Sequence, residues 1–268
     1  SAADCSDGAI TSINITSGAS SVSYRYLDNS AVSAQTLTVT ESALSDTTTF
    51  TTTAGPVDHL AISSNNGQSV VAGECQGTVT IEGQDQFNNV ATATSTVNLT
   101  ATSNTSGTIS FYSDNSCTSA LSGGASSITT GNTDVTIYFK DDLVAVGNTL
   151  TVTYLAQTIT QSYNVTPNAP SSLGITSSAP APTAGVCTNG SPLTVELRDV
   201  HNNLVDYGSD VTFSIASDSN GASFYSDSSC SNVVTTVTVP ANSNSTPLYI
   251  KDNVAATATI TTNNLSTN

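Results

Sequence analysis

Hydrophobic and polar residues alternate along several short stretches of the chain, which is typical of half-buried β-strands. Residues 135–139 read VTIYF, so that valine, isoleucine and phenylalanine share one face of a strand while threonine and tyrosine share the other. Residues 149–155 (TLTVTYL) and 210–216 (DVTFSIA) alternate in the same way. Gly, Asn and Ser separate these runs, and no run has the hydrophobic spacing of a helix. The pattern therefore predicts an all-β protein with short strands.

Five cysteines show that these strands belong to a tandem repeat. The interval from Cys5 to Cys117 equals the interval from Cys75 to Cys187. The interval from Cys117 to Cys230 is longer by a single position. Two interleaved series with one period indicate a repeat of about 112 residues that carries two cysteines.

Sequence motifs around the cysteines return at the same interval. Three of them are FYSDNSC (111–117) and FYSDSSC (224–230), IEGQDQFNNV (81–90) and VELRDVHNNL (195–204), and IYFKDD (137–142) and LYIKDN (248–253). Short strands that follow one another closely, with turn residues between them, in units of this length predict antiparallel β-sandwiches.

Proline and small residues near Pro56 and Pro170 mark the borders between units. We therefore expect the C-terminal part of a domain over residues 1–55, a complete domain over 56–168 and a further domain over 169–268. In this third unit the chain beyond the Lys-Asp pair is shorter than its counterpart in the second unit. We expect the third unit to lack its last strand.

The charge of the chain limits the classes of partner that it can bind. The formal net charge is −16, with only four Lys and Arg residues in 268. Phosphate binding needs clustered Lys and Arg, so nucleic acid is excluded as a partner, and anionic membrane surfaces are disfavoured for the same reason. No segment approaches the roughly 20 apolar residues of a membrane-spanning helix, so we expect no membrane insertion in this segment.

The cysteine spacing within a unit predicts one disulfide for each. The interval between Cys75 and Cys117 matches that between Cys187 and Cys230 to within one position. Zinc would require closely spaced cysteines or a nearby histidine, and a catalytic thiol would require a base that recurs with it. Cys5 belongs to the second series, so we expect its partner to lie outside the chain, before residue 1. Disulfides indicate an oxidising compartment, and we expect an extracellular or cell-surface location.

No residue has the setting of a catalytic group. His59 and His201 stand at different positions of the repeat, where their counterparts are Ser172 and Phe87. A repeated catalytic site would repeat its base, because a nucleophile needs one within reach. We therefore expect no enzyme activity, no catalytic residue and no cofactor.

Two lysines suggest an alternative kind of crosslink. Lys140 and Lys251 recur in step with Glu82 and Glu196, as a Lys–Asn isopeptide bond with an acidic catalyst would require. However, Lys140 shares the strand face of Tyr138, which is opposite to the hydrophobic face. We expect an outward lysine in a surface ion pair, which contributes about 0–1 kcal/mol.

A second repeated motif combines aspartate and asparagine. Asp85 and Asp199 are each followed three residues later by an Asn-Asn pair, which is typical of a turn closed by its own side chains. A Ca²⁺ site is the alternative, because Asp206 and Asp210 would add oxygen ligands in the third unit. The second unit has no acidic residue at the matching stretch, so we favour the turn.

The order of these motifs resembles a repeat family of immunoglobulin-like (Ig-like) domains in large bacterial surface and adhesin proteins. In the second unit the order is LAI, AGEC, VTIEGQDQFNN, FYSDNSC and YFKD, and in the third it is LGI, AGVC, LTVELRDVHNN, FYSDSSC and YIKD. The strand that ends in Asp-x-x-x-Asn is similar to that of invasin-type and intimin-type domains. The resemblance implies tandem Ig-like β-sandwiches in a secreted or surface-displayed protein, and it implies no catalytic residue.

Three functions remain open at this point. The first is a structural repeat segment of an adhesin stalk or fibre, whose partners are neighbouring repeats or subunits of the same protein. The second is a filament subunit whose neighbours complete one another by β-strand addition. The third is a glycan-binding module, for which the outward Tyr138 and Tyr249 are few and regularly spaced.

Overall fold

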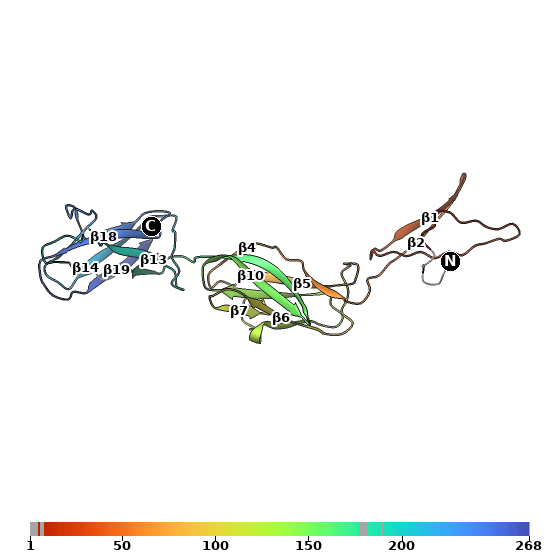
Figure 1. Ribbon diagram of the computed structural model, residues 1–268, viewed down its shortest axis with the longest axis horizontal. Coiled ribbons are helices and arrows are strands. Elements are labelled where there is room, and N and C mark those ends of the chain that lie inside the picture. Colours follow the sequence, from red (N-terminus) through yellow and green to blue (C-terminus); the bar gives the residue numbers. More distant parts are fainter. Residues whose placement is uncertain (1–4, 6–7, 177–181, 189, 268) are drawn as a thin grey trace.

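The computed structural model describes residues 5, 8–176, 182–188 and 190–267, and these residues form β-strands and loops (Figure 1). The described part has no α-helix, and its one helical element is the 3-10 turn η1 (Ser122–Gly124). Three parts follow one another along an elongated molecule, with an N-terminal hairpin at one end and a sandwich at each of the next two positions (Figure 1). We call the sandwich of strands β3 to β11 the second unit and that of β12 to β19 the third unit.

The second unit consists of two facing sheets. One sheet has the strand order β3-β5-β9-β7 and the other has the order β4-β11-β10-β6-β8. All neighbouring strands are antiparallel except β4 and β11, which run parallel. The strands are β3 (His59–Ile62), β4 (Gln68–Val71), β5 (Gly77–Gln84), β6 (Val97–Ser103), β7 (Ile109–Tyr112), β8 (Ala125–Ile128), β9 (Asp134–Asp141), β10 (Ala145–Tyr154) and β11 (Gln157–Thr166).

This strand order is that of an immunoglobulin domain. The order β3-β5-β9-β7 matches strands A-B-E-D, and β11-β10-β6 matches strands G-F-C of the opposite sheet. Strand β4 lies beside the G position and β8 lies beside the C position. The predicted fold class, tandem Ig-like β-sandwiches with one disulfide in each, is confirmed.

The core of the second unit follows from the alternation seen in the sequence. Along β5, buried and half-buried residues alternate without interruption, and β9 shows the same pattern from Ile137 onward. The Tyr163 ring meets the Phe139 ring edge-on at a centroid distance of 4.9 Å. The largest fully buried side chains here are Tyr163, Phe139, Ile81, Ile128, Ile137 and Leu150.

The third unit repeats this design with fewer strands. Its sheets have the orders β12-β13-β18-β15-β16 and β17-β14-β19. The core between them includes Val195, Leu197, Phe213 and Leu248. The strands are β12 (Ser172–Ile175), β13 (Leu193–Arg198), β14 (Val211–Ser217), β15 (Ala222–Tyr225), β16 (Val233–Val234), β17 (Thr236–Val239), β18 (Ser245–Asp252) and β19 (Ile260–Thr267).

Strand β19 takes the place that β10 occupies in the second unit. Ile260 pairs with Ser217 of β14, as Leu150 pairs with Ser103 of β6. In the second unit, β11 lies on the other side of β10. In the third unit, no strand among the described residues lies on the other side of β19.

The segment 1–55 contributes one hairpin, formed by β1 (Gln35–Glu41) and β2 (Leu44–Phe50). Both strands are exposed over most of their length. Gln35 pairs with Phe50, which is the pairing that Asn148 and Tyr163 make between β10 and β11. The hairpin therefore has the register of the last two strands of a complete unit, although it packs against no sheet among the described residues.

Candidate functional site

In each unit, one disulfide joins two loops that flank strands of the same sheet. Cys75 and Cys117 are bonded with Cα atoms 5.8 Å apart, and Cys187 and Cys230 are bonded with Cα atoms 5.9 Å apart. Each bond links the loop before β5 or β13 to the turn after the Phe-Tyr strand, β7 or β15. In the chain-entropy model, closing a loop of this size stabilises a unit by about 4 kcal/mol. Cys5 is a free cysteine in this structure.

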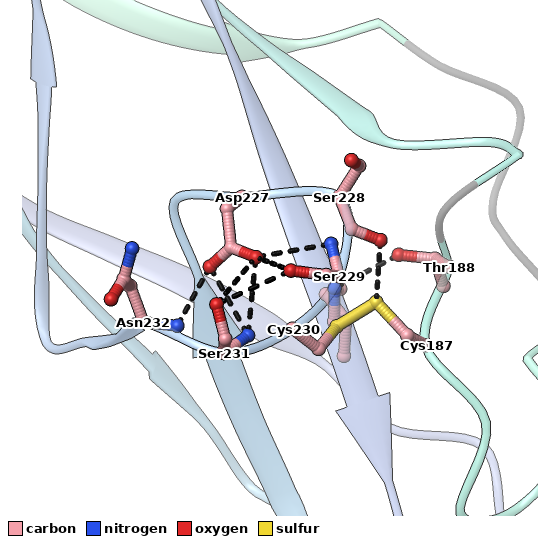
Figure 2. Close-up of a disulfide and its surroundings, with 9 residues drawn as sticks. Cys187, Thr188, Asp227, Ser228, Ser229, Cys230, Ser231 and Asn232 are labelled. Carbon is pink, nitrogen blue, oxygen red and sulfur yellow. Dashed lines mark hydrogen bonds between the residues drawn. A yellow bond between two sulfur atoms is a disulfide. The ribbon is translucent and has the colours of Figure 1, made fainter.

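An aspartate organises the turn that carries the second cysteine of each bond. In the third unit the Asp227 carboxylate accepts hydrogen bonds from the backbone N–H groups of Ser229, Ser231 and Asn232 (Figure 2). The hydroxyls of Ser229 and Ser231 also donate to it. These hydrogen bonds, with the Ser229 hydroxyl first, hold the pKa of Asp227 well below its ordinary value.

The second unit has the same turn around Asp114. Its carboxylate accepts from the backbone N–H groups of Ser116, Thr118 and Ser119 and from the Thr118 hydroxyl. The hydrogen bond from the Ser119 N–H is the largest of the effects that lower the pKa of Asp114 to about 2. The turn sets Cys117 at a positive φ of 50°. Sequence reasoning missed this role, although the aspartate recurs in both copies of the FYSD motif.

The predicted Asp-Asn turn is present and closes on itself. Asp85 Oδ1 accepts from the backbone N–H groups of Phe87 and Asn89, at 2.9 and 3.0 Å. The Asn89 side chain donates to both carboxylate oxygens. This side-chain hydrogen bond is the first cause of the lowering of the Asp85 pKa to about 2. Asn88 takes a positive φ of 65°, which asparagine tolerates better than most residues.

The same turn also contacts the preceding part of the chain. Asn89 Oδ1 accepts from the Ala31 N–H at 2.9 Å, and its Nδ2 donates to the Asn29 carbonyl at 2.7 Å. Asp85 Oδ2 accepts from the N–H of Gly55, in the linker, at 2.9 Å. Three hydrogen bonds therefore join the turn of the second unit to the segment before it.

The third unit makes these three bonds to the second unit. Asn203 Oδ1 accepts from the Val144 N–H at 3.0 Å, and its Nδ2 donates to the Asp142 carbonyl at 2.7 Å. Asp199 Oδ2 accepts from the N–H of Asn168, in the linker, at 3.1 Å. We call this repeated arrangement, Asp85 with Asn89 and Asp199 with Asn203, the junction clamp. The sequence predicted the turns but not that they join neighbouring units.

The burial of Asp199 and its hydrogen bonds act in opposite directions. Burial raises the pKa of this carboxyl, but the bonds from Asn203, Asn168 and His201 outweigh it and the pKa is lowered. Asp199 is therefore ionised over the ordinary pH range, which strengthens the hydrogen bonds it accepts. Within the described residues, no group of three or more His, Cys, Asp or Glu side chains could hold a metal ion. The acidic oxygens of the clamp are already directed at N–H donors.

His201 also lies at the joint between the second and third units. Gly73 has a φ of 75°, and a Cβ at this position would lie 1.9 Å from His201 Nε2. His59 instead lies between Asp58 and Asn88, at 3.2 and 3.1 Å. Neither histidine contacts a nucleophile in the hydrogen bonds of the described chain, and His201 covers a glycine that has no room for a side chain.

The lysine expected to form an ion pair contacts an aromatic ring instead. Lys140 Nζ lies 5.7 Å from the centre of the Tyr112 ring, where the face of the ring attracts a cation. Glu196, which recurs in step with Lys251, forms an ion pair with Arg198. The expected surface ion pair of Lys140 is not among the ion pairs of the described residues.

A buried polar cluster in the second unit was also missed. The Tyr163 hydroxyl lies 2.7 Å from both Asp141 Oδ2 and Ser103 Oγ. Asn148 Nδ2 donates to the same carboxylate oxygen at 3.4 Å. Burial raises the pKa of Tyr163, and the neighbouring Asp141 raises it further. The signal in the sequence was the aspartate that follows lysine in both YFKD and YIKD.

The third unit has an open cavity in the matching place. Its volume is about 600 Å³, and it lies beside β19 and the loop that precedes this strand. Its wall combines apolar residues with a few polar ones, and includes Leu193, Ser217, Phe224, Ile250, Asp252 and Ile260.

No family model matches the chain, and no curated protein matches it. Similar solved structures include domains 4 and 5 of the S-layer protein SbsC, at 19% identity over 49% of this chain and 65% of that one, with a TM-score of 0.29. Domains 5–6 of SbsC match at 20% identity over 77% and 90%, with a TM-score of 0.30. Invasin, a bacterial integrin-binding protein, matches at 14% identity over 76% of this chain and 35% of that one, with a TM-score of 0.31.

The chain thus spans less than two thirds of the first of these structures and about a third of invasin. At TM-scores near 0.3 the similarity carries no argument about function, and the fold assignment rests on the strand order. In the described residues, no helix is both long enough and apolar enough to span a membrane.

Proposed function

We propose that this chain is a non-catalytic structural segment of an extracellular or cell-surface stalk or fibre. The observation that carries the proposal is the junction clamp, which recurs at both joints with the same three hydrogen bonds. A chain of independent binding modules needs no fixed geometry between them, whereas a stalk does. Repetition of one joint along the chain produces a regular rod.

Three further features support this proposal. Each unit is closed by a disulfide, which persists in oxidising compartments outside the cell. The units lie in line rather than side by side (Figure 1). The motif order resembles that of Ig-like repeats in bacterial surface and adhesin proteins. We propose the unit boundaries 1–55, 56–168 and 169–268, with neighbouring repeats or subunits of the same protein as partners.

The junction clamp can be tested by the variant Asn203→Ala. This change removes both bonds from the third unit to Asp142 and Val144, so we expect a wider range of angles between the two units. Small-angle X-ray scattering should then give a shorter mean overall length and a broader distribution of interatomic distances for the variant than for the unchanged protein.

Asn232→Ala is the matched control, because it removes an exposed asparagine of the same unit, outside the joint. Asn203→Ala also removes the bonds from this side chain to Asp199, so it should melt at a lower temperature than the control. The scattering is compared at a temperature where calorimetry shows both variants to be folded, which separates loss of alignment from unfolding. Identical scattering from all three proteins would mean that the clamp does not align the units, and the stalk proposal would fail.

A further inference from the structure

The cavity of the third unit lies where the second unit holds a tyrosine. In the second unit, β11 places Tyr163 against Phe139, with its hydroxyl on Ser103 and Asp141. By strand register, Ser217 is the counterpart of Ser103 and Asp252 that of Asp141, and both line the cavity. Nothing in the described residues of the third unit takes the place of Tyr163.

The two polar groups are arranged for an aromatic side chain. Ser217 Oγ accepts from the Ser219 N–H at 3.1 Å, as Ser103 Oγ accepts from the Thr105 N–H at 3.2 Å. The hydrogen bonds that Asp252 accepts are to its Oδ1, from the Ser219 hydroxyl and the Val254 N–H. The counterpart of its Oδ2 is the atom of Asp141 that binds the tyrosine hydroxyl.

The chain also contains a strand of the matching kind that is packed into no sandwich. Strand β2 has the hairpin register of β11, with Phe50 at the position of Tyr163. Among the described residues, Phe50 has one ring contact, with Tyr26, which is itself 54% exposed. A two-stranded hairpin without a supporting sheet is marginally stable in water, so β2 can exchange its partner at low cost.

The positions of the two features favour a partner molecule. Figure 1 shows the N-terminal hairpin and the third unit at opposite ends of the elongated molecule, with the second unit between them. A strand at one end therefore reaches a groove at the other end more readily in a second copy than in its own chain. Head-to-tail contacts of this kind produce open filaments.

We propose that β2 of a second copy inserts beside β19 and places Phe50 in the cavity of the third unit, so that copies join head to tail. This inference rests on the proposed structural function and names its partner, a second copy of this chain. Strand β2 gives up β1 and pairs with β19, in the register that β10 and β11 have in the second unit. No covalent bond forms or breaks.

Each contact that β2 and the clamp give up has a counterpart in the new joint. The Asn89 side chain, now on Asn29 and Ala31, would bond the equivalent backbone groups of Asn253 and Ala255 in the other copy. The exchange conserves these bonds but leaves β1 without its strand partner, and the burial of a phenylalanine offsets this loss.

Phe87 also gains a site in the new joint. It stands at the repeat position of His201, which covers Gly73, and is 45% exposed in the single chain. The counterpart of Gly73 is Gly185, at a φ of 78°, where a Cβ would meet only the Asn253 side chain at 3.7 Å. Phe87 of the second copy would therefore cover Gly185 as His201 covers Gly73.

Sedimentation velocity of the 268-residue chain at increasing concentration tests the proposal. We expect oligomers of the unchanged protein and at least about a hundredfold weaker association of Phe50→Asp, because a carboxylate would enter an apolar cavity. Thr49→Asp is the matched control, since it adds the same charge to the outward face of the same strand and should leave association unchanged. Phe50→Tyr should associate about tenfold more tightly, because its hydroxyl can reach Asp252 and Ser217.

A disulfide trap identifies the contact itself. In the background Cys5→Ser, one protein carries Thr47→Cys and a second carries Thr261→Cys, which are the counterparts of the paired Thr160 and Thr151. Mixing the two should yield a crosslinked heterodimer under mild oxidation.

Three results would overturn the inference. One is a chain that stays monomeric at every concentration, another is association that Phe50→Asp does not weaken, and the third is the absence of a crosslinked heterodimer when the two cysteine variants are mixed and oxidised. Each would leave the Asn203→Ala result untouched, so failure of the stalk proposal is recognised separately.

Discussion

Single aspartates organise the turns of this protein, and each does so as a charged acceptor. Asp114 and Asp227 accept hydrogen bonds from backbone N–H groups of the turns that carry the second cysteine of each disulfide. Asp85 and Asp199 accept such bonds in the turns at the joints between units. Hydrogen bonds to a charged carboxylate are roughly twice as strong as those to a neutral acceptor. The turns should therefore weaken when these groups take up protons.

The pH dependence of Asp114 follows from its lowered pKa. The pKa is about 2 in the folded chain against an ordinary value of 3.8, so the stabilisation is fully present above pH 3.8 and is lost as the pH falls toward 2. We expect the melting temperature of the second unit to fall steeply in this window. In Asp114→Asn it should be lower near neutral pH, with a shallower decline in acid, when followed by calorimetry.

Asp134→Asn is the control for that measurement. The Asp134 side chain is exposed and accepts a hydrogen bond only from the neighbouring Thr133 hydroxyl. The melting temperature of Asp134→Asn should therefore fall with decreasing pH in the same way as that of the unchanged protein. Equal slopes for all three proteins would show that the turn around Asp114 does not contribute to acid stability.

At the scale of the element, strand β11 contributes its largest buried side chain, Tyr163, to the core of the second unit. Its ring fills part of the core, and its hydroxyl lies within hydrogen-bond distance of the buried Asp141 carboxylate and the half-buried Ser103 hydroxyl. Tyr163 thus places an apolar ring in the core and a polar hydroxyl beside the Asp141 carboxylate.

Tyr163→Phe should destabilise the second unit by about 1–3 kcal/mol, because it removes a hydroxyl from a buried carboxylate. Urea unfolding followed by circular dichroism measures this difference. Tyr138→Phe serves as the control, since Tyr138 lies on the outward face of β9. An equally large decrease in the free energy of unfolding of Tyr138→Phe would show that the effect comes from removing any tyrosine hydroxyl and not from the buried cluster.

At the scale of the whole molecule, the two units differ in how much of their stability depends on the disulfide. The third unit has no strand beyond β19 in its described residues, and its core contains no counterpart of Tyr163. Each disulfide closes a loop of similar size, with separations of 42 and 43 residues. Loss of the disulfide therefore removes a larger fraction of the free energy of unfolding of the third unit than of the second unit.

We expect reduction to unfold the third unit first. Hydrogen exchange measured by mass spectrometry, with and without a reductant, should show loss of protection in β13 and β18 before β5 and β9. If both units lost protection together, the difference in their cores would not control their stability.

The sequence by itself determined the features that depend on local spacing. Alternation in runs such as 135–139 predicted strands and their buried faces, because side chains in a strand alternate at every residue wherever the strand lies. The period of the cysteines and their motifs predicted tandem sandwiches with a disulfide in each, because two copies of one pattern must fold alike.

Only the tertiary structure decided how the units meet and what fills their cores. The hydrogen bonds of the junction clamp join residues 30 to 61 positions apart, and those of the Tyr163 hydroxyl join residues 22 and 60 positions apart. Such contacts depend on how the loops and sheets are placed in space, which no local pattern records. The sequence therefore predicted turns at Asp85 and Asp199. Their second role, bonding the preceding segment, is visible only in the tertiary structure.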